Sequence, residues 1–180
     1  MSKEAIVLVL VNLFRRYGYE GASLAQISKV TGLGKASLYH YFPGGKEEMV
    51  RAALDYIDNW VETNILKILR SNASPLERLQ AMCQQVEVFY DRGQTPCLWA
   101  ILTLEESSDR FHTRIKQALT VWIEVLADVL KEAGIEAELA TIRAQEAILR
   151  IQGALILTRG LNDTTPFERT MKSLAEELLS

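Results

Sequence analysis

The chain has 180 residues, of which 48% are hydrophobic, so it is long enough to bury a substantial core. Its two cysteines have neither metal-ligand spacing nor the density of a secreted disulfide framework. The early apolar run, residues 5–11, is far shorter than the roughly 20 residues of a membrane span, and no small-residue cleavage site follows it. We therefore expect a cytoplasmic protein that has no membrane partner, cofactor or metal.

The net charge of -3 conceals an uneven distribution along the chain. Residues 1–46 carry six lysines and arginines against two glutamates, whereas the remainder carries 14 basic and 21 acidic side chains. A basic segment joined to an acidic body is typical of a protein that contacts nucleic acid at one end. Chance drift of the surface charge is the alternative explanation.

The first predicted element is a helix over residues 3–17. Its alternating valines also fit a buried strand, but its length and the segment Asn12–Arg16 favour a helix, which Gly18 ends. The inward face would consist of Ile6, Leu10, Leu13 and Phe14.

The segment Ser23–Lys46 predicts two short helices joined by a glycine turn. Ser23 and Gln26 have the spacing of a capping box, in which each side chain bonds the other residue's backbone N–H. Gly32 is placed for the left-handed position that ends the first helix, and Lys35 begins the second. Such a pair is the helix-turn-helix signature, whose second helix lies in the DNA major groove.

This segment resembles the DNA-binding domain of the tetracycline-repressor (TetR-type) family. The resemblance rests on Tyr17–Glu20, on the glycine turn and on the run Ser37–Phe42. The ending Pro43–Lys46 resembles the branch that contains drug-efflux and electrophile-responsive regulators. Because the match covers roughly the first quarter of the chain, the remainder is interpreted from its own pattern.

The resemblance implies which side chains touch DNA. Lys35 would lie at the base-facing start of the second helix, where a lysine can donate to guanine O6 and N7. Ser23 and Lys46, each at a helix N-terminus, would hold the phosphate backbone, while Leu38 and Phe42 would face the core. A connector helix whose aromatic residues only pack is the alternative. The predicted DNA-contacting residues are Ser23, Lys35, Ala36, Ser37, Tyr39, His40, Tyr41 and Lys46.

The rest of the chain shows helical periodicity throughout. The predicted helices cover residues 46–70, 75–92, 97–106, 109–133, 137–160 and 165–178, with Ser107 or Ser108 as the N-cap of the fourth. We expect an all-α fold in two domains. Residues 1–46 would form a three-helix helix-turn-helix domain, and residues 47–180 a ligand-binding and dimerisation domain of about six helices.

Aromatic, methionine and polar residues on separate helices of the body predict a ligand cavity, because such cavities are mostly apolar with a few placed polar groups. Ordinary core packing is the alternative for each aromatic or methionine residue. The predicted ligand-binding residues are Trp60, Asn64, Met82, Phe89, Trp99, Thr103, Phe111 and Trp122.

The helix over residues 137–160 has two opposed apolar sides, whereas a surface helix of a monomer needs only one. The second side therefore predicts a partner chain, and we expect the last two helices to form a homodimer. The predicted interface residues are Ile148, Leu149, Gly153, Ile156, Phe167 and Met171.

These patterns predict a ligand-responsive transcriptional repressor, released from double-stranded operator DNA by a small apolar or amphipathic effector. A small helical enzyme for an apolar substrate is one alternative, although the chain has no nucleophile motif, metal cluster or phosphate loop. A DNA-binding protein without a ligand is another. Cys97, which follows Pro96 at a predicted helix start, is either a redox or electrophile sensor or an inert buried thiol.

Overall fold

The structure is a computed structural model that describes residues 2–106 and 109–180. Within these two ranges it is built of helices and contains no strand, which confirms the predicted all-α class. Across the same residues, no helix combines the length and the apolar character needed to cross a bilayer. The N-cap expected at Ser107 or Ser108 lies outside the described residues.

Two compact units make up the chain. The first contains residues Met1–Asn59 and Leu98–Ile115, and the second contains Trp60–Cys97 and Lys116–Ser180. The cuts after Asn59 and after Ile115 fall inside helices rather than in loops. These helices are α4 (Gly45–Val61) and α8 (Asp109–Glu132).

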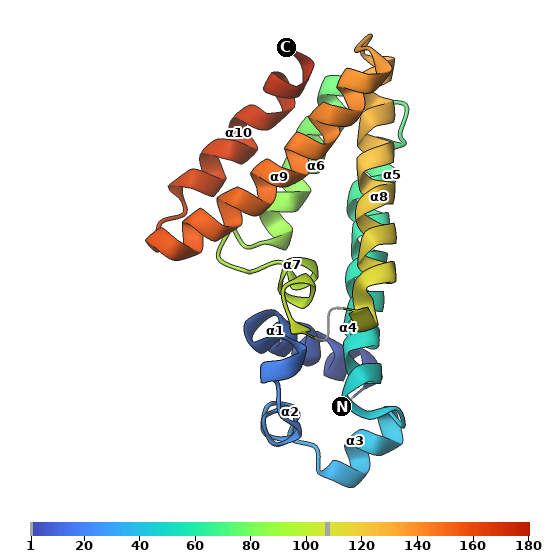
Figure 1. The fold of residues 1–180 in the computed structure, drawn as a ribbon, viewed down its shortest axis with the longest axis vertical. Coiled ribbons are helices and arrows are strands. Elements are labelled where there is room, and N and C mark those ends of the chain that lie inside the picture. Colours follow the sequence, from blue (N-terminus) through green and yellow to red (C-terminus); the bar gives the residue numbers. More distant parts are fainter. Residues whose placement is uncertain (1, 107–108) are drawn as a thin grey trace. The chain divides into compact units, whose positions relative to one another are not determined.

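The first unit holds the helices predicted to bind DNA (Figure 1). In chain order it contains α1 (Lys3–Gly21), α2 (Leu24–Thr31), α3 (Lys35–Tyr41), most of α4, α7 (Leu98–Thr103) and the start of α8. All four residues predicted to form the inward face of α1 are buried. The predicted orientation of this helix is therefore confirmed.

Helix α1 is kinked at Gly18, whose backbone has φ 67° and ψ -171°. The regular helix ends there, as predicted, but the chain then makes one further helical turn to Gly21. The predicted end at residue 17 missed this turn, because nothing in the local sequence supplies an N-cap for it.

Polar contacts join the start of α8 to α4 within the first unit. Arg114 donates from Nη2 to Oδ2 of Asp58 (2.7 Å), and Arg110 donates from Nη1 to Oε2 of Glu47 (2.8 Å). Hydrogen bonds from Arg51 and Arg110 hold the pKa of Glu47 below its usual value. These contacts explain why residues far along the chain belong to the unit that contains α1–α3.

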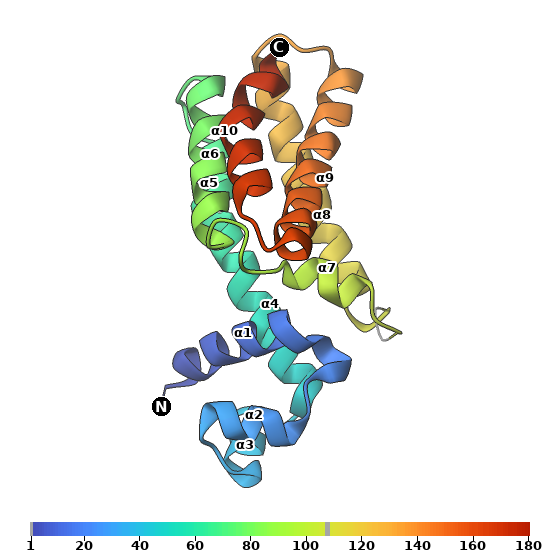
Figure 2. The ribbon, with the colours of Figure 1, turned by 90° about the vertical axis from the view of Figure 1, so that its left-hand side faces the viewer.

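The second unit is a bundle in which α10 packs against both α9 and α6 (Figure 2). Its elements are the end of α4, η1 (Glu62–Leu66), α5 (Lys67–Leu69), α6 (Pro75–Phe89), most of α8, α9 (Ala137–Leu161) and α10 (Thr165–Leu179). Helix α6 begins with a capping box between Ser74 and Glu77. It ends earlier than the predicted residue 92, because Asp91 and Arg92 adopt positive φ angles.

The helix predicted as continuous from residue 46 to 70 is interrupted by a π-helical turn, η1. The side chain of Asn64 donates to the carbonyl of Trp60 (2.9 Å) in this turn, and Arg70 pairs with Glu62 across it (2.7 Å). A π-helical turn adds one residue to the helical ladder and shifts the buried face that follows it. The buried residues Ile57, Val61, Ile65 and Leu69 follow one another at intervals of four, which also fits an uninterrupted helix, so the sequence pattern does not reveal the turn.

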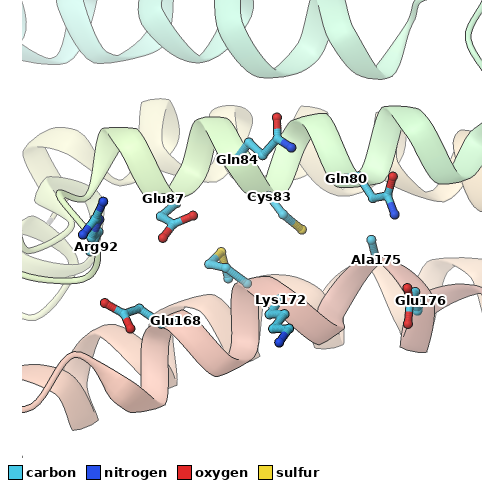
Figure 3. Close-up of a pocket in the computed structure, with 10 residues that line it drawn as sticks. Gln80, Cys83, Gln84, Glu87, Arg92, Glu168, Lys172, Ala175 and Glu176 are labelled. Atoms are coloured by element: carbon cyan, nitrogen blue, oxygen red, sulfur yellow. The ribbon is translucent and has the colours of Figure 1, made fainter.

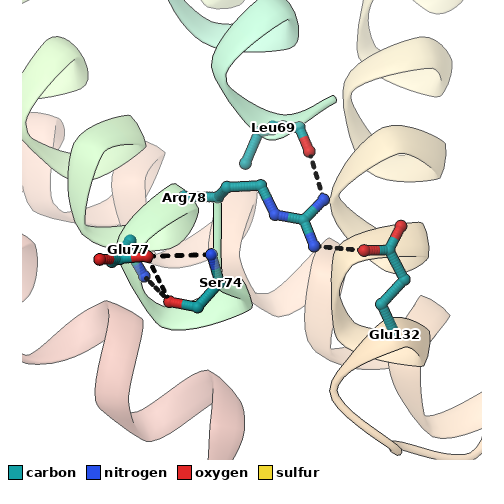
Figure 4. Close-up of polar contacts among 5 residues, drawn as sticks. All are labelled: Leu69, Ser74, Glu77, Arg78 and Glu132. Carbon is teal, nitrogen blue, oxygen red and sulfur yellow. Dashed lines mark hydrogen bonds and ion pairs between the residues drawn. The ribbon is translucent and has the colours of Figure 1, made fainter. Parts of the chain in front are cut away.

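Arg78 ties three segments of the second unit together (Figure 4). Its side chain is only 4% exposed, yet it donates to the carbonyl of Leu69 (2.9 Å) and pairs with Glu132 near the end of α8. A buried guanidinium is tolerated only when it is paired and hydrogen-bonded, so these two contacts fix α5, α6 and α8 relative to each other.

Candidate nucleic-acid interface

Helix α2 begins with the predicted capping box. The backbone N–H of Gln26 donates to Oγ of Ser23 (3.2 Å), and the backbone N–H of Ser23 donates to Oε1 of Gln26 (2.8 Å). Two donors at the helix start are thereby satisfied by two neighbouring side chains. The capping box expected from the sequence is confirmed.

The turn between α2 and α3 is held by local hydrogen bonds. Gly32 has φ 68°, the left-handed conformation expected at the end of α2. The hydroxyl of Thr31 donates to the carbonyl of Ile27 (2.7 Å) and accepts from the backbone N–H of Leu33 (3.3 Å). The hydroxyl of Ser28 donates to the carbonyl of Leu33 (2.5 Å), which closes the turn. This network restrains the backbone between α2 and α3.

Helix α3 separates its residues into a buried and an exposed side. Leu38 and Phe42 are 1% and 0% exposed, so both pack in the core as predicted. Five of the residues predicted to touch DNA lie on the exposed side, and Tyr41 is half-buried. The five exposed residues are Lys35, Ala36, Ser37, Tyr39 and His40.

Lys46 lies in the first turn of α4 and is half-buried. Its Nζ lies 4.3 Å from the centroid of the Tyr19 ring, which is the distance of a cation–π contact. At the same helix end, the carboxylate of Glu48 accepts from the backbone N–H of Gly44 (2.6 Å). Ser23, the other residue expected to hold phosphate, is exposed at the start of α2.

Two segments of this chain match models of known protein families. Residues 2–53 match the model described as bacterial regulatory proteins of the tetR family. Residues 75–173, more than half of the chain, match the model of the transcriptional regulator LmrA/YxaF-like C-terminal domain. The chain belongs to the TetR family. It is a DNA-binding transcriptional regulator, and this identifies α2 and α3 as its helix-turn-helix.

Individual relatives agree with this assignment. The HTH-type transcriptional regulators LmrA and YxaF of Bacillus subtilis are 27% and 30% identical to the chain, and each alignment covers 92% of it. The alignments cover 90% of LmrA and 88% of YxaF. A crystal structure of a TetR transcriptional regulator from Legionella pneumophila shares the fold, with a TM-score of 0.86, 23% identity and coverage of 98% and 97% of the two chains. These relatives are regulators rather than enzymes.

The residues predicted to line a ligand cavity are divided between the two compact units of this TetR-family chain. Trp99, Thr103 and Phe111 belong to the first unit, and the other five belong to the second. Trp60 and Phe89 stack on each other with ring centroids 4.2 Å apart. The buried members of the set are Met82, Trp99, Phe111 and Trp122. A cavity formed by these residues stays a prediction.

A groove of about 620 Å³ lies between α6 and α10 (Figure 3). Charged and amide side chains from both helices line it together with Cys83, Met171 and Ala175. None of the eight residues predicted to bind a ligand lines this groove. Its polar walls also differ from the apolar cavity that the sequence predicted.

The predicted dimer residues divide into two groups. Leu149 and Ile156 are 69% and 70% exposed on α9, whereas Ile148 on the other side of that helix is buried. Phe167 and Met171 are also buried, because α10 packs them within its own chain. These last three residues therefore expose little surface in the single chain, and an interface formed by the six predicted residues stays a prediction.

Both cysteines are free and buried in the protomer. Cys83 lies on α6, where burial raises the pKa of its thiol to about 11. Such a thiol stays protonated at neutral pH, so it is not poised to react. Cys97 lies immediately before α7 and is also largely inaccessible.

Sequence reasoning missed the contacts that the α7–α8 region makes with the DNA-binding helices. Glu105 accepts from the backbone of Tyr19, and Arg110 lies 5.8 Å from the ring of the same tyrosine. Neither residue belongs to a motif, and both lie more than 80 residues from Tyr19 in the chain. No short-range sequence signal reveals these contacts.

The backbone of the turn makes a prediction about its two glycines. A Cβ added at Gly32 or at Gly34 would meet no atom within 4 Å, but Gly32 has φ 68° and Gly34 has φ -67°. We expect Gly32→Ala to lower the free energy of unfolding by about 1 kcal/mol through backbone strain alone. Gly34→Ala should leave the free energy of unfolding almost unchanged. Alanine is a poorer N-cap for α3 than glycine, but it also lowers the conformational entropy of the unfolded chain, and the two effects oppose each other.

Urea unfolding of both variants measures this difference, and operator binding shows whether the turn also sets the direction of α3. Equal stability losses for the two variants would contradict the prediction.

Proposed function

We propose that this TetR-family regulator is a repressor that binds operator DNA as a homodimer and leaves it when a small apolar or amphipathic effector binds. The observation that carries the DNA-binding role is the division of α3 into a buried side, with Leu38 and Phe42, and an exposed side that begins with Lys35. An anchored helix with polar and basic residues at its exposed start can insert into the major groove.

We assign DNA binding to residues 1–46 and effector binding and dimerisation to residues 47–180. The basic character of the first segment supports this division. In this proposal the protein acts in the cytoplasm, where its operator DNA is located.

On α3, Lys35, Ala36 and Ser37 would face base edges, and Tyr39, His40 and Tyr41 would contact phosphates. Ser23 and Lys46 would hold the backbone on either side of the groove. Contacts to phosphate fix the position of the protein, whereas contacts to base edges select the sequence. The two kinds of contact can therefore be told apart by experiment.

Dimerisation would use the exposed apolar stripe of α9. Ile142, Leu149 and Ile156 recur every seven residues and are all exposed, and Gly153 lies along the same stripe. A seven-residue repeat keeps one seam of a helix facing a partner helix, and a glycine on that seam lets the two backbones approach closely. An exposed row of large apolar residues is costly in water, which favours its burial against a second copy.

The effector would contact the half-buried pair Trp60 and Phe89. Trp60 lies in the last turn of α4, just before the π-helical turn that starts at Glu62, and π-helical turns in helices often occur at functional sites. An effector that binds better to one conformation of this helix would shift the protein toward that conformation.

The roles of the two lysines lead to different expectations for DNA binding. Lys46→Ala should weaken binding to operator and random DNA alike and reduce the slope of log affinity against log salt by roughly one per subunit. Lys35→Ala should lose about 1–3 kcal/mol for the preferred base at one position of each half-site. Fluorescence-anisotropy titrations at several salt concentrations measure both effects. Equal losses of Lys35→Ala on operator and random DNA would show that this residue does not read a base.

Charge placed on the stripe of α9 should separate the dimer. We expect Ile156→Arg to sediment as a folded monomer at micromolar concentration, because the buried seam cannot accommodate two unpaired guanidinium groups. Val88→Arg is the matched control, since Val88 is an exposed apolar residue (72%) on α6 that lies off the stripe. An Ile156→Arg variant that sediments like the wild type would exclude this interface.

Effector release obeys thermodynamic linkage. A compound that weakens operator binding by a given factor must itself bind more weakly by the same factor when operator is saturating. The test titrates the first compound found to release operator in a mobility-shift screen, with tryptophan fluorescence as the readout, in the presence and absence of DNA. Identical compound affinities in the two titrations would rule out allosteric release by that compound.

A further inference from the structure

The carboxylate of Glu105 binds the backbone of α1. The N–H of Tyr19 donates to Oε2 (2.9 Å), and the N–H of Glu20 donates to Oε1 (3.1 Å). These two donors begin the helical turn that follows the kink at Gly18, where donors have no partner inside the helix. Glu105 therefore does for this turn what an N-cap residue does for an ordinary helix, although it lies 86 residues from Tyr19 in the chain.

The backbone at Gly18 is shaped for this carboxylate. Its φ of +67° disfavours any residue with a side chain, and a Cβ at this position would lie 1.9 Å from Oε1 of Glu105. The glycine therefore serves two purposes, because it allows the kink and leaves room for the carboxylate. This fit makes the contact a built feature of the first unit.

The ring of Tyr19 connects this cap to a residue of the DNA interface. Nζ of Lys46, on α4, lies 4.3 Å from the centroid of the Tyr19 ring. The Phe111 ring packs edge-on against the same ring, with centroids 5.5 Å apart. Because the backbone of Tyr19 is fixed by Glu105, the place of its ring, and of the ammonium that rests on it, is fixed as well. The contacts run from Glu105 through Tyr19 to Lys46, all within the first compact unit.

We propose that Glu105 is a positioning residue for DNA binding, which holds Tyr19 so that its ring places the Lys46 ammonium against the phosphate backbone. The inference rests on the phosphate-binding role proposed above for Lys46. Glu105 lies in the segment that matches the C-terminal family model, and Tyr19 and Lys46 lie in the segment that matches the N-terminal one. The DNA-binding unit is therefore completed by a side chain from the other matched segment.

The test uses the full chain and the salt dependence of operator binding. Glu105→Ala should weaken operator binding and reduce the salt slope by roughly one per subunit, as Lys46→Ala does. The double variant should be no weaker than the Lys46→Ala variant, because both substitutions remove the same phosphate contact. Glu105→Gln keeps one oxygen acceptor for the two N–H groups and should recover part of the affinity and of the slope.

The matched control is Glu106→Ala, which removes the adjacent exposed carboxylate. Removing an acidic side chain should by itself favour DNA binding slightly, because it reduces repulsion from the phosphates. Weaker binding of Glu105→Ala is therefore opposite in sign to the effect of the charge change. A slope for Glu105→Ala equal to that of the wild type, or additive losses in the double variant, would overturn the proposal.

Amide hydrogen exchange separates positioning from general loss of structure. In Glu105→Ala the amides of Tyr19 and Glu20 should exchange faster, while the Ile27 amide, which bonds to the carbonyl of Ser23 in α2, should keep its protection. Uniformly faster exchange across the first unit would overturn the proposal. If Lys46→Ala leaves the salt slope unchanged, the phosphate-binding role of Lys46 itself is refuted. If Lys46→Ala changes the slope and Glu105→Ala does not, only the positioning role of Glu105 is refuted.

Discussion

The two helices of the DNA-binding motif are too short to be stable without the rest of their unit. Helix α2 has 8 residues and α3 has 7, whereas isolated helices shorter than roughly 12–15 residues are marginal in water. Their conformation depends on the burial of Ile27, Leu38 and Phe42 in the shared core. The direction of the exposed side of α3 is therefore a property of the core beneath it, and local hydrogen bonds in the turn only refine it.

That core is completed by residues that are distant in the sequence. The segment Leu98–Ile115 belongs to the same compact unit as the first 59 residues, and it supplies Glu105, Arg110 and Arg114 as polar contacts to α1 and α4. Two family models match the chain in two separate segments, yet its packing does not divide at the same positions. The DNA-binding unit is consequently sensitive to substitutions in a part of the chain that does not touch DNA in our proposal.

Helix α9 presents the opposite case, in which a sequence pattern anticipates a surface. Its two apolar sides are visible in the sequence, and in the structure one side is buried in the second unit while Leu149 and Ile156 remain exposed. The pattern could not indicate that α10 would bury Phe167 and Met171 within the same chain. An apolar face that packs against its own chain has the same sequence pattern as one that packs against a second chain. The residues that remain available to a partner were decided by the packing of α10 against α6 and α9.

The sequence by itself determined the all-α class, the capping box at Ser23, the left-handed Gly32 and the buried side of α3. Each of these depends on residues within a few positions of one another, so the signal is local. Tertiary structure alone decided the π-helical turn, the buried Arg78 with its partner Glu132, and the cap that Glu105 provides to α1. These features pair groups that are far apart in the chain, or add one residue where the intervals of four between buried residues also fit an uninterrupted helix, so local periodicity does not reveal them.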